Sequence, residues 1–232
     1  MRPPPTPTRL ALILGLTLVA LPSISQHQHD TGANQPHGSR GMHHDFSDVE
    51  RYSKMFDDPD RAAWQKPAEL LAALGVEAGM TVADVGAGTG FFLSHLADAV
   101  RPDGHVLALD VEAKMVDFMR ERITSEQLAS VEARKIAPDD PGLEDGSVDR
   151  ILIVNVWHHI DDRDRYAGVL RAALATGGSV AVVDYDAQSP HGPPKKHRLA
   201  PEVVKSELEA GGLSVEILEE TLPYQYVVVG AP

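Results

Sequence analysis

The chain has 232 residues, of which 43% are apolar and 24% charged, so we expect a core of ordinary size rather than wholesale disorder. Its formal net charge of −13 argues against nucleic acid as a main partner, because duplex binding needs a positively charged surface. It has no cysteine, which excludes disulfides, thiolate catalysis and cysteine-ligated metal centres.

Residues 1–25 have the pattern of a secretory signal. Arg2 and Arg9 are the only charges, and an apolar run at 10–21 precedes small residues that end at Ser25. The run is short for a membrane span, which needs ~20 apolar residues. We expect cleavage after Ser25 and an exported protein, periplasmic or secreted. The alternative is a retained N-terminal anchor with the domain facing the cytoplasm, and only then do we expect membrane contact.

Residues 26–45 are polar and turn-rich and contain five of the eleven histidines. Neutral imidazoles together with Asp45 could bind Zn²⁺ or Cu²⁺. Their irregular spacing favours a flexible tail instead, so we assign no metal site there. Residues 46–232 are expected to form one domain.

The pattern after residue 60 alternates between strands and helices. A helix is predicted from Asp60 to Gly75, the first as its cap and the second as its end. Alternation of this kind predicts a parallel sheet covered on both faces, and two last strands without a helix between them predict an antiparallel hairpin. The strands are expected at 81–85, 105–109, 130–134, 148–154, 179–183, 215–219 and 224–229, and the later helices at 91–99, 112–122, 161–175 and 201–210.

The sharpest signal is a glycine-rich loop after the first strand, with Gly86, Gly88 and Gly90 at alternate positions. Glycine permits positive φ and close approach of a ligand to the backbone, although a tight turn without a ligand needs glycine too. A dinucleotide fingerprint would require glycine where Phe91 stands, so a pyrophosphate site is disfavoured. Asp84, just before the loop, would repel phosphate but attract an ammonium group.

Asp110 ends the second strand, 20 residues after Gly90. A carboxylate at this place can accept hydrogen bonds from two ribose hydroxyls. It can also cap the helix that is predicted from Glu112, and the two roles are compatible.

These segments together resemble the class I S-adenosylmethionine (SAM) dependent methyltransferases, over about residues 60–230. The resemblance is closest to the small-molecule branch that includes the ubiquinone- and menaquinone-type enzymes. It implies an α/β, Rossmann-like fold: a mostly parallel seven-stranded sheet with helices on both faces and a C-terminal antiparallel strand pair. The matching segments are 83–90 (ADVGAGTG), 107–110 (LALD), 143–149 (LEDGSVD), 155–160 (NVWHHI) and the glycine pair at 177–178.

The resemblance implies SAM as the cofactor and a set of residues that bind it. The glycine loop would pass under the methionine moiety, Asp84 would lie near its amino group, and Asp110 would hold the ribose. Where relatives often carry an acidic residue for the adenine, this chain has Ala137; Asp139, Asp140 or a backbone carbonyl could make that contact instead, and we include Asp139 in the set. The complete predicted cofactor set is Asp84, Gly86, Ala87, Gly88, Gly90, Asp110, Val111, Met115, Asp139 and Asn155.

Two adjacent histidines, His158 and His159, follow the most apolar strand at the ligand end of the sheet. Histidine can act as a general base near neutral pH, so we predict a catalytic role for this pair; the alternative is a structural hydrogen bond. Trp157 could line the acceptor site or pack in the core. The segment lacks the Pro-Pro of the motif used by amino-methylating nucleic-acid enzymes.

The loop after the fifth strand carries a basic run at 195–198, which is either an anion-binding element or a solvated loop. We predict a methyltransferase acting on a small molecule. Because SAM is made in the cytoplasm, export would leave the enzyme without an obvious supply. The alternative is therefore an exported, non-catalytic SAM-like or metal-binding protein that uses the His-rich tail.

Overall fold

The computed structural model describes residues 48–219 and 222–232. The predicted signal at 1–25 and the predicted His-rich tail at 26–45 lie outside these residues. The described residues belong to one compact unit that spans His37–Pro232. Within them, no helix has both the length and the apolar character that a membrane crossing requires.

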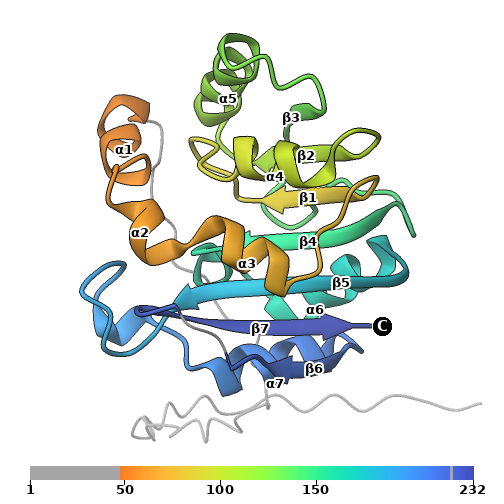
Figure 1. Ribbon diagram of the computed structural model, residues 1–232. Helices are drawn as coiled ribbons and strands as arrows, with labels where there is room; N and C mark the ends of the chain where they lie inside the picture. Colours follow the sequence, from red (N-terminus) through yellow and green to blue (C-terminus); the bar gives the residue numbers. More distant parts are fainter. Residues whose placement is uncertain (1–47, 220–221) are drawn as a thin grey trace, which may run out of the picture. The chain divides into compact units, whose positions relative to one another are not determined.

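One seven-stranded sheet organises the fold, in the order β3-β2-β1-β4-β5-β7-β6 (Figure 1). The first five strands of this order are mutually parallel, and β7 runs antiparallel to both β5 and β6. The predicted sheet and its closing antiparallel pair are therefore confirmed. The strands are β1 (Thr81–Val85), β2 (His105–Asp110), β3 (Val131–Lys135), β4 (Val148–Val154), β5 (Leu174–Tyr185), β6 (Ser214–Ile217) and β7 (Gln225–Ala231).

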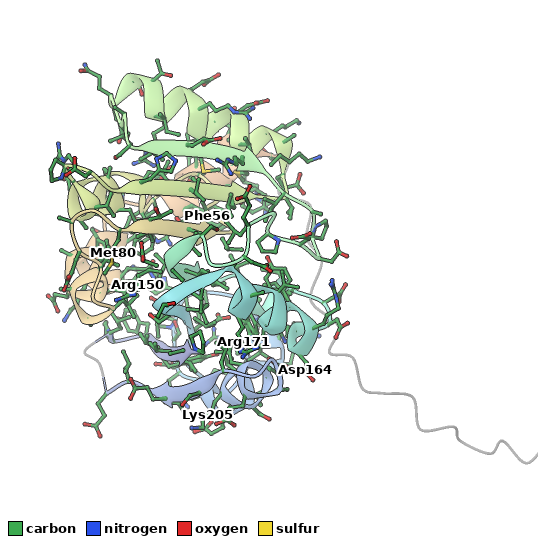
Figure 2. The ribbon with its side chains drawn as sticks, turned by 90° about the vertical axis from the view of Figure 1, so that its right-hand side faces the viewer. Phe56, Met80, Arg150, Asp164, Arg171 and Lys205 are labelled. Atoms are coloured by element: carbon green, nitrogen blue, oxygen red, sulfur yellow. The ribbon has the colours of Figure 1, made fainter. Side chains whose placement is uncertain are left out.

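Helices cover both faces of the sheet (Figure 1). One face packs against α3, α4 and α5, and the other packs against α6 and α7. Asp164 and Arg171 lie on the solvent-exposed side of α6 (Figure 2). The helices are α1 (Val49–Phe56), α2 (Arg61–Gln65), α3 (Pro67–Ala73), α4 (Leu93–Val100), α5 (Ala113–Ser125), α6 (Arg163–Ala173) and α7 (Pro201–Ala210), with 3₁₀ turns at Trp157–His159 and Lys195–His197.

Strand periodicity decides which side chains meet which helices. Val82 packs with the core of the first face and Ala83 with the core of the second, because successive side chains point to opposite sides. Each buried Val or Leu stabilises the fold by about 1.5–3 kcal/mol. By the same alternation, Asp84 and Asp110 lie on the first face at the carboxyl ends of β1 and β2. The order reverses between β1 and β4, and sheets of this kind bind ligands at such a point.

The predicted helix from Asp60 to Gly75 is two helices, α2 and α3, so its continuity was wrong. Lys66 breaks it with a left-handed φ of 45°. The cause is Pro67, because proline disfavours the helical conformation in the residue before it. α1, just inside the predicted domain start, was not predicted.

The boundary between α6 and β5 also differs from the prediction of a helix over 161–175. The helix ends at Ala173, and β5 begins at Leu174, before the glycine pair. Leu174 pairs with Val148 of β4 ahead of an irregularity in the register. A cross-strand contact therefore overrides the local helical pattern.

The amino ends of the central strands are tied together by backbone contacts. Arg150, labelled in Figure 2, donates from Nε to the Leu74 carbonyl at 2.9 Å. The Asp149 carboxylate accepts a hydrogen bond from the Thr81 N–H at 2.8 Å. These contacts lie at the end of the sheet opposite to Asp84 and Asp110.

Candidate functional site

The glycine loop has the conformation that its sequence predicts. Gly86, Gly88 and Gly90 have φ of +76°, +59° and +83°, a region in which side chains are strained. A Cβ at Gly86 would lie 2.4 Å from a methyl of Val156, and one at Gly90 would lie 2.5 Å from Leu93. Glycine is therefore required at these two positions by packing as well as by φ, with or without a ligand.

The carboxylate of Asp84 is the feature of the site that indicates a ligand. The residue is only 3% exposed, yet its carboxylate makes no hydrogen bond within the described residues. Burial raises the pKa of Asp84 to about 7; nearby Arg61 opposes this shift and Asp110 adds to it. Every side-chain nitrogen or oxygen sealed from solvent in the described part has a partner, so the carboxylate must remain accessible. An accessible carboxylate without a protein donor suits a cationic ligand group, such as an ammonium.

Asp110 holds the glycine loop and caps the next helix. Its Oδ2 accepts from the Gly88 N–H at 2.8 Å, and its Oδ1 accepts from the Glu112 N–H at 2.9 Å. Burial raises the pKa of Asp110, while these two backbone bonds lower it. A carboxylate has about four lone-pair sites, so two remain for a pair of ribose hydroxyls.

The connection between α1 and α2 is anchored to the same loop. The Asp57 carboxylate accepts hydrogen bonds from the Thr89 hydroxyl at 3.2 Å and from Arg122 at 3.0 Å. Arg122 also donates to the Thr89 carbonyl at 3.3 Å. The residues that precede the sheet are thereby brought to the edge of the site.

Arg61 of α2 is the cation beside Asp84. Its Cζ lies 4.0 Å from the ring centroid of Phe91, and Nη1 donates to the Phe56 carbonyl at 2.7 Å. Burial lowers the pKa of Arg61, while Tyr185, Asp57 and Asp84 oppose that shift. The guanidinium nevertheless stays charged at any physiological pH.

A line of side-chain amides connects Arg61 to Asn155. Arg61 Nε donates to Gln65 Oε1, Gln65 Nε2 donates to Gln225 Oε1, and Gln225 Nε2 donates to Asn155 Oδ1, each at 2.6 Å. Gln65 and Gln225 are 0% and 3% exposed. Asn155 directly follows β4 with φ of +60°, a conformation that asparagine tolerates. We call these three amides and Arg61 the amide relay.

His158 forms a buried pair with Asp184 at the carboxyl end of β5. Its Nδ1 lies 2.7 Å from Asp184 Oδ2, and both side chains are 4% exposed. The other oxygen of Asp184 accepts from the Tyr185 N–H at 2.8 Å, which fixes the carboxylate. Nε2 of His158 makes no hydrogen bond within residues 48–219 and 222–232, so it is not sealed from solvent. His159 lies beside it, with 4.2 Å between ring centroids.

The remaining predicted cofactor residues lie at different depths. Met115 is 1% exposed in the core, whereas Val111 is 39% exposed. Ala87 donates its N–H to the Leu109 carbonyl. The Asp139 carboxylate is 73% exposed and pairs with Arg165 at 3.3 Å. Its role toward adenine stays a prediction.

Packing resolves the alternative at Trp157, whereas the role of the basic run stays open. Trp157 is fully buried and donates to Glu207 at 2.8 Å, so it is a core residue. In the basic run, Arg198 is used within its own loop, whereas Lys195 and Lys196 are exposed. The carbonyls to which Arg198 donates belong to Asp186, Ser189, His191 and Pro193.

The sequence did not reveal Arg61, Gln65, Gln225 or the role of Asp184. Gln65 and Gln225 are far apart in the chain, and no local sequence pattern predicts their contact. Asp184 could have been found as the polar residue at the end of a buried strand. Within the described residues, no group of three or more His, Asp or Glu side chains could hold a metal ion.

Comparison with known proteins identifies a family and relatives that fit the site described above. A family model described as a methyltransferase domain matches residues 76–222. An arsenite methyltransferase of Halobacterium salinarum is 29% identical over 147 residues, which is 63% of this chain and 36% of the relative. A demethylmenaquinone methyltransferase of Listeria monocytogenes is 28% identical over 121 residues, which is 52% and 50% respectively. The chain thus spans between 36% and 50% of the length of these curated relatives.

A solved structure, a SAM-dependent methyltransferase from Aquifex aeolicus, has the same fold. It matches with a TM-score of 0.74 and 28% identity, covering 81% of this chain and 98% of that one. The site fits the same cofactor, because Asp84 offers an unpartnered carboxylate to an ammonium and Asp110 keeps lone pairs for the ribose hydroxyls. The chain belongs to the methyltransferase-domain family and has the fold of class I SAM-dependent methyltransferases, whose cofactor is SAM.

Proposed function

We propose that this protein transfers a methyl group from SAM to a small-molecule acceptor whose nucleophile gives up its proton to His158. The observation that carries the proposal is the buried His158–Asp184 pair at the carboxyl end of the sheet. SAM supplies an electrophilic methyl group on a sulfonium. The residues that would hold it are the glycine loop, Asp84 at the ammonium and Asp110 at the ribose.

In this proposal His158 is the base and Asp184 is a positioning residue. Asp184 accepts a hydrogen bond from the Nδ1–H of His158, which leaves the lone pair of the ring on Nε2, a nitrogen without a protein partner in the described residues. When Nε2 takes the acceptor's proton, the adjacent carboxylate stabilises the imidazolium. We therefore assign the base to His158 of the predicted pair, because Asp184 holds its ring in place.

The acceptor we favour is a small hydroxylated organic molecule. Two relatives are described by their names as acting on arsenite and on demethylmenaquinone. Trivalent arsenic is a soft centre that thiolates bind best, and this chain has no cysteine. The net charge of −13 also disfavours a nucleic-acid acceptor. A quinol-like acceptor fits a site in which histidine can remove a hydroxyl proton.

Export remains a separate proposal, which rests on the pattern of residues 1–25 alone. A C-terminal reporter that is active only outside the cytoplasm tests it. Activity of the reporter supports export, and inactivity with full expression supports a domain that faces the cytoplasm.

The test of function compares His158→Gln with the matched control His159→Gln. Each full-length variant is titrated with S-adenosylhomocysteine and assayed for label transfer from methyl-labelled SAM to naphthoquinols and catechols. We expect His158→Gln to lower turnover by about 10²–10⁴-fold, the usual value of a general base, while cofactor affinity stays within about twofold. Full turnover in His158→Gln would refute the base. Cofactor binding without transfer to any hydroxylated probe would refute the acceptor class.

A further inference from the structure

The amide relay has one possible direction. Arg61 is an obligate donor, so Gln65 must turn its oxygen toward it. The Gln65 NH₂ then faces Gln225, which must in turn present its own oxygen. The Gln225 NH₂ therefore faces Asn155, whose oxygen accepts it. Reversing any amide would place two donors against each other at 2.6 Å in a buried site.

This direction determines which group of Asn155, the last amide of the relay, is left for a ligand. Asn155 uses Oδ1 for Gln225, so the group it has left is the Nδ2 amide, which only donates. Nδ2 makes no hydrogen bond within the part of the chain that the structure describes, and it is not sealed from solvent. The charge of Arg61 thus fixes the polarity of a side chain that it does not touch.

Asn155 lies at the carboxyl end of β4, next to the glycine loop. The next residue, Val156, occupies the space above Gly86, as a Cβ placed there would meet it at 2.4 Å. The base His158 lies on the same short segment, through the turn Trp157–His159. Gln225 is on the sheet face of Val227 and Asp184 on that of Val182, so Asn155 and His158 reach the carboxyl edge from opposite faces.

We propose that the amide relay makes Asn155 a hydrogen-bond donor to the methyl acceptor, and so favours an acceptor hydroxyl, which becomes a phenolate or enolate as His158 takes its proton, over an amine. This inference rests on the proposed function and adds the class of acceptor. An ammonium or amine proton would face the Asn155 NH₂ as donor against donor, whereas an oxyanion would accept from it. Asn155, predicted as a cofactor residue, becomes a specificity residue, with Gln65 and Gln225 as positioning residues.

The Asn155 amide could also donate to the carboxylate of the cofactor's methionine moiety. The experiment therefore distinguishes a hydrogen bond to the cofactor from one to the methyl acceptor. Full-length protein labelled with ¹⁵N is first observed by NMR at the Asn155 side-chain amide. S-adenosylhomocysteine is added alone, and then with 2-hydroxy-1,4-naphthoquinone as the oxyanion probe. We expect the Asn155 NH₂ protons to exchange freely with water until the oxyanion probe is added. Protection by S-adenosylhomocysteine alone would assign the donor to the cofactor and overturn the proposal.

The second measurement is selectivity. With S-adenosylhomocysteine bound, calorimetry compares the oxyanion probe with 1-naphthylmethylamine in wild type, Gln225→Met and the matched control Gln188→Met, which alters an exposed glutamine. We expect the oxyanion preference to fall about tenfold in Gln225→Met and to persist in Gln188→Met, because only the former frees the Asn155 amide to rotate. An unchanged preference, or none in wild type, overturns the proposal. Loss of S-adenosylhomocysteine binding in wild type would instead refute the proposed function.

Discussion

Replacing Asp84 by asparagine should stabilise the free protein and weaken its hold on SAM. The pKa of this carboxyl is raised from 3.8 to about 7, chiefly by burial. Between these two values the folded state binds more protons than the unfolded state, so the free energy of unfolding falls as pH rises through this window and is level above it. Asp84→Asn removes that loss, and the gain should therefore be large at pH 8 and small at pH 5.

The size of the gain follows from the shift. Ionising a group whose pKa rises from 3.8 to about 7 costs the folded state about 4 kcal/mol at pH 8 and about 1.5 kcal/mol at pH 5. The new amide also needs partners, at about 1–2 kcal/mol, but this cost is the same at both pH values. The difference between pH 8 and pH 5, about 2.5 kcal/mol, is therefore the decisive quantity, and it corresponds to about 5–10 °C in Tm.

The assay is denaturant unfolding of the ligand-free protein at the two pH values, followed by titration with SAM. Loss of the charged hydrogen bond should weaken binding by about 1.5–3 kcal/mol, and only wild type should bind more tightly as pH rises toward 8. Asp149→Asn, at the other end of the same strand pair, is the control and should leave SAM affinity unchanged. If Asp84→Asn gives the same stability difference at both pH values and full SAM affinity, the carboxylate is neither desolvated nor used by the cofactor.

Two further changes test the rest of the cofactor site. Asp110→Ala removes the acceptor of the Gly88 N–H and the predicted ribose contact, so calorimetry should show SAM affinity lower by about 1–3 kcal/mol; unchanged affinity would refute the ribose role. Gly86→Ala should lower Tm and SAM affinity together, because its Cβ would meet Val156 at 2.4 Å. Adding Val156→Ala should restore part of the Tm but not the strain from φ of +76°, and full recovery would show that the clash alone mattered.

Features that depend on neighbouring residues could be predicted from the sequence. The glycine loop, its carboxylate Asp84 and the capping position of Asp110 all lie within a few residues of a strand end, where the chemistry of each type is local. The break at Lys66 was equally local, since the proline after it disfavours a continuous helix, and that signal was missed. The early start of β5 was not local, because it depends on pairing with β4.

The acceptor side of the site could not be derived in this way. His158 was predicted, but its carboxylate partner Asp184 comes from the next strand, and only the sheet brings the two together. Gln65 and Gln225 carry no motif at all. Their hydrogen bond joins α2 to β7, and an amide pair is indistinguishable in sequence from two surface glutamines until burial is known.

This division has a physical meaning for how one fold serves many acceptors. Asp84, Asp110, Asn155, His158 and Asp184 all lie within residues 76–222, the segment that matches the methyltransferase-domain family. The residues that set the polarity of Asn155 lie outside it: Arg61 and Gln65 before it, and Gln225 after it. Arg61 acts on both the cofactor site and the acceptor site, since it lowers the pKa of Asp84 and also orients the relay. A shared core can thus keep its cofactor chemistry, while the flanking segments decide whether the methyl acceptor meets a hydrogen-bond donor or a hydrogen-bond acceptor of the protein.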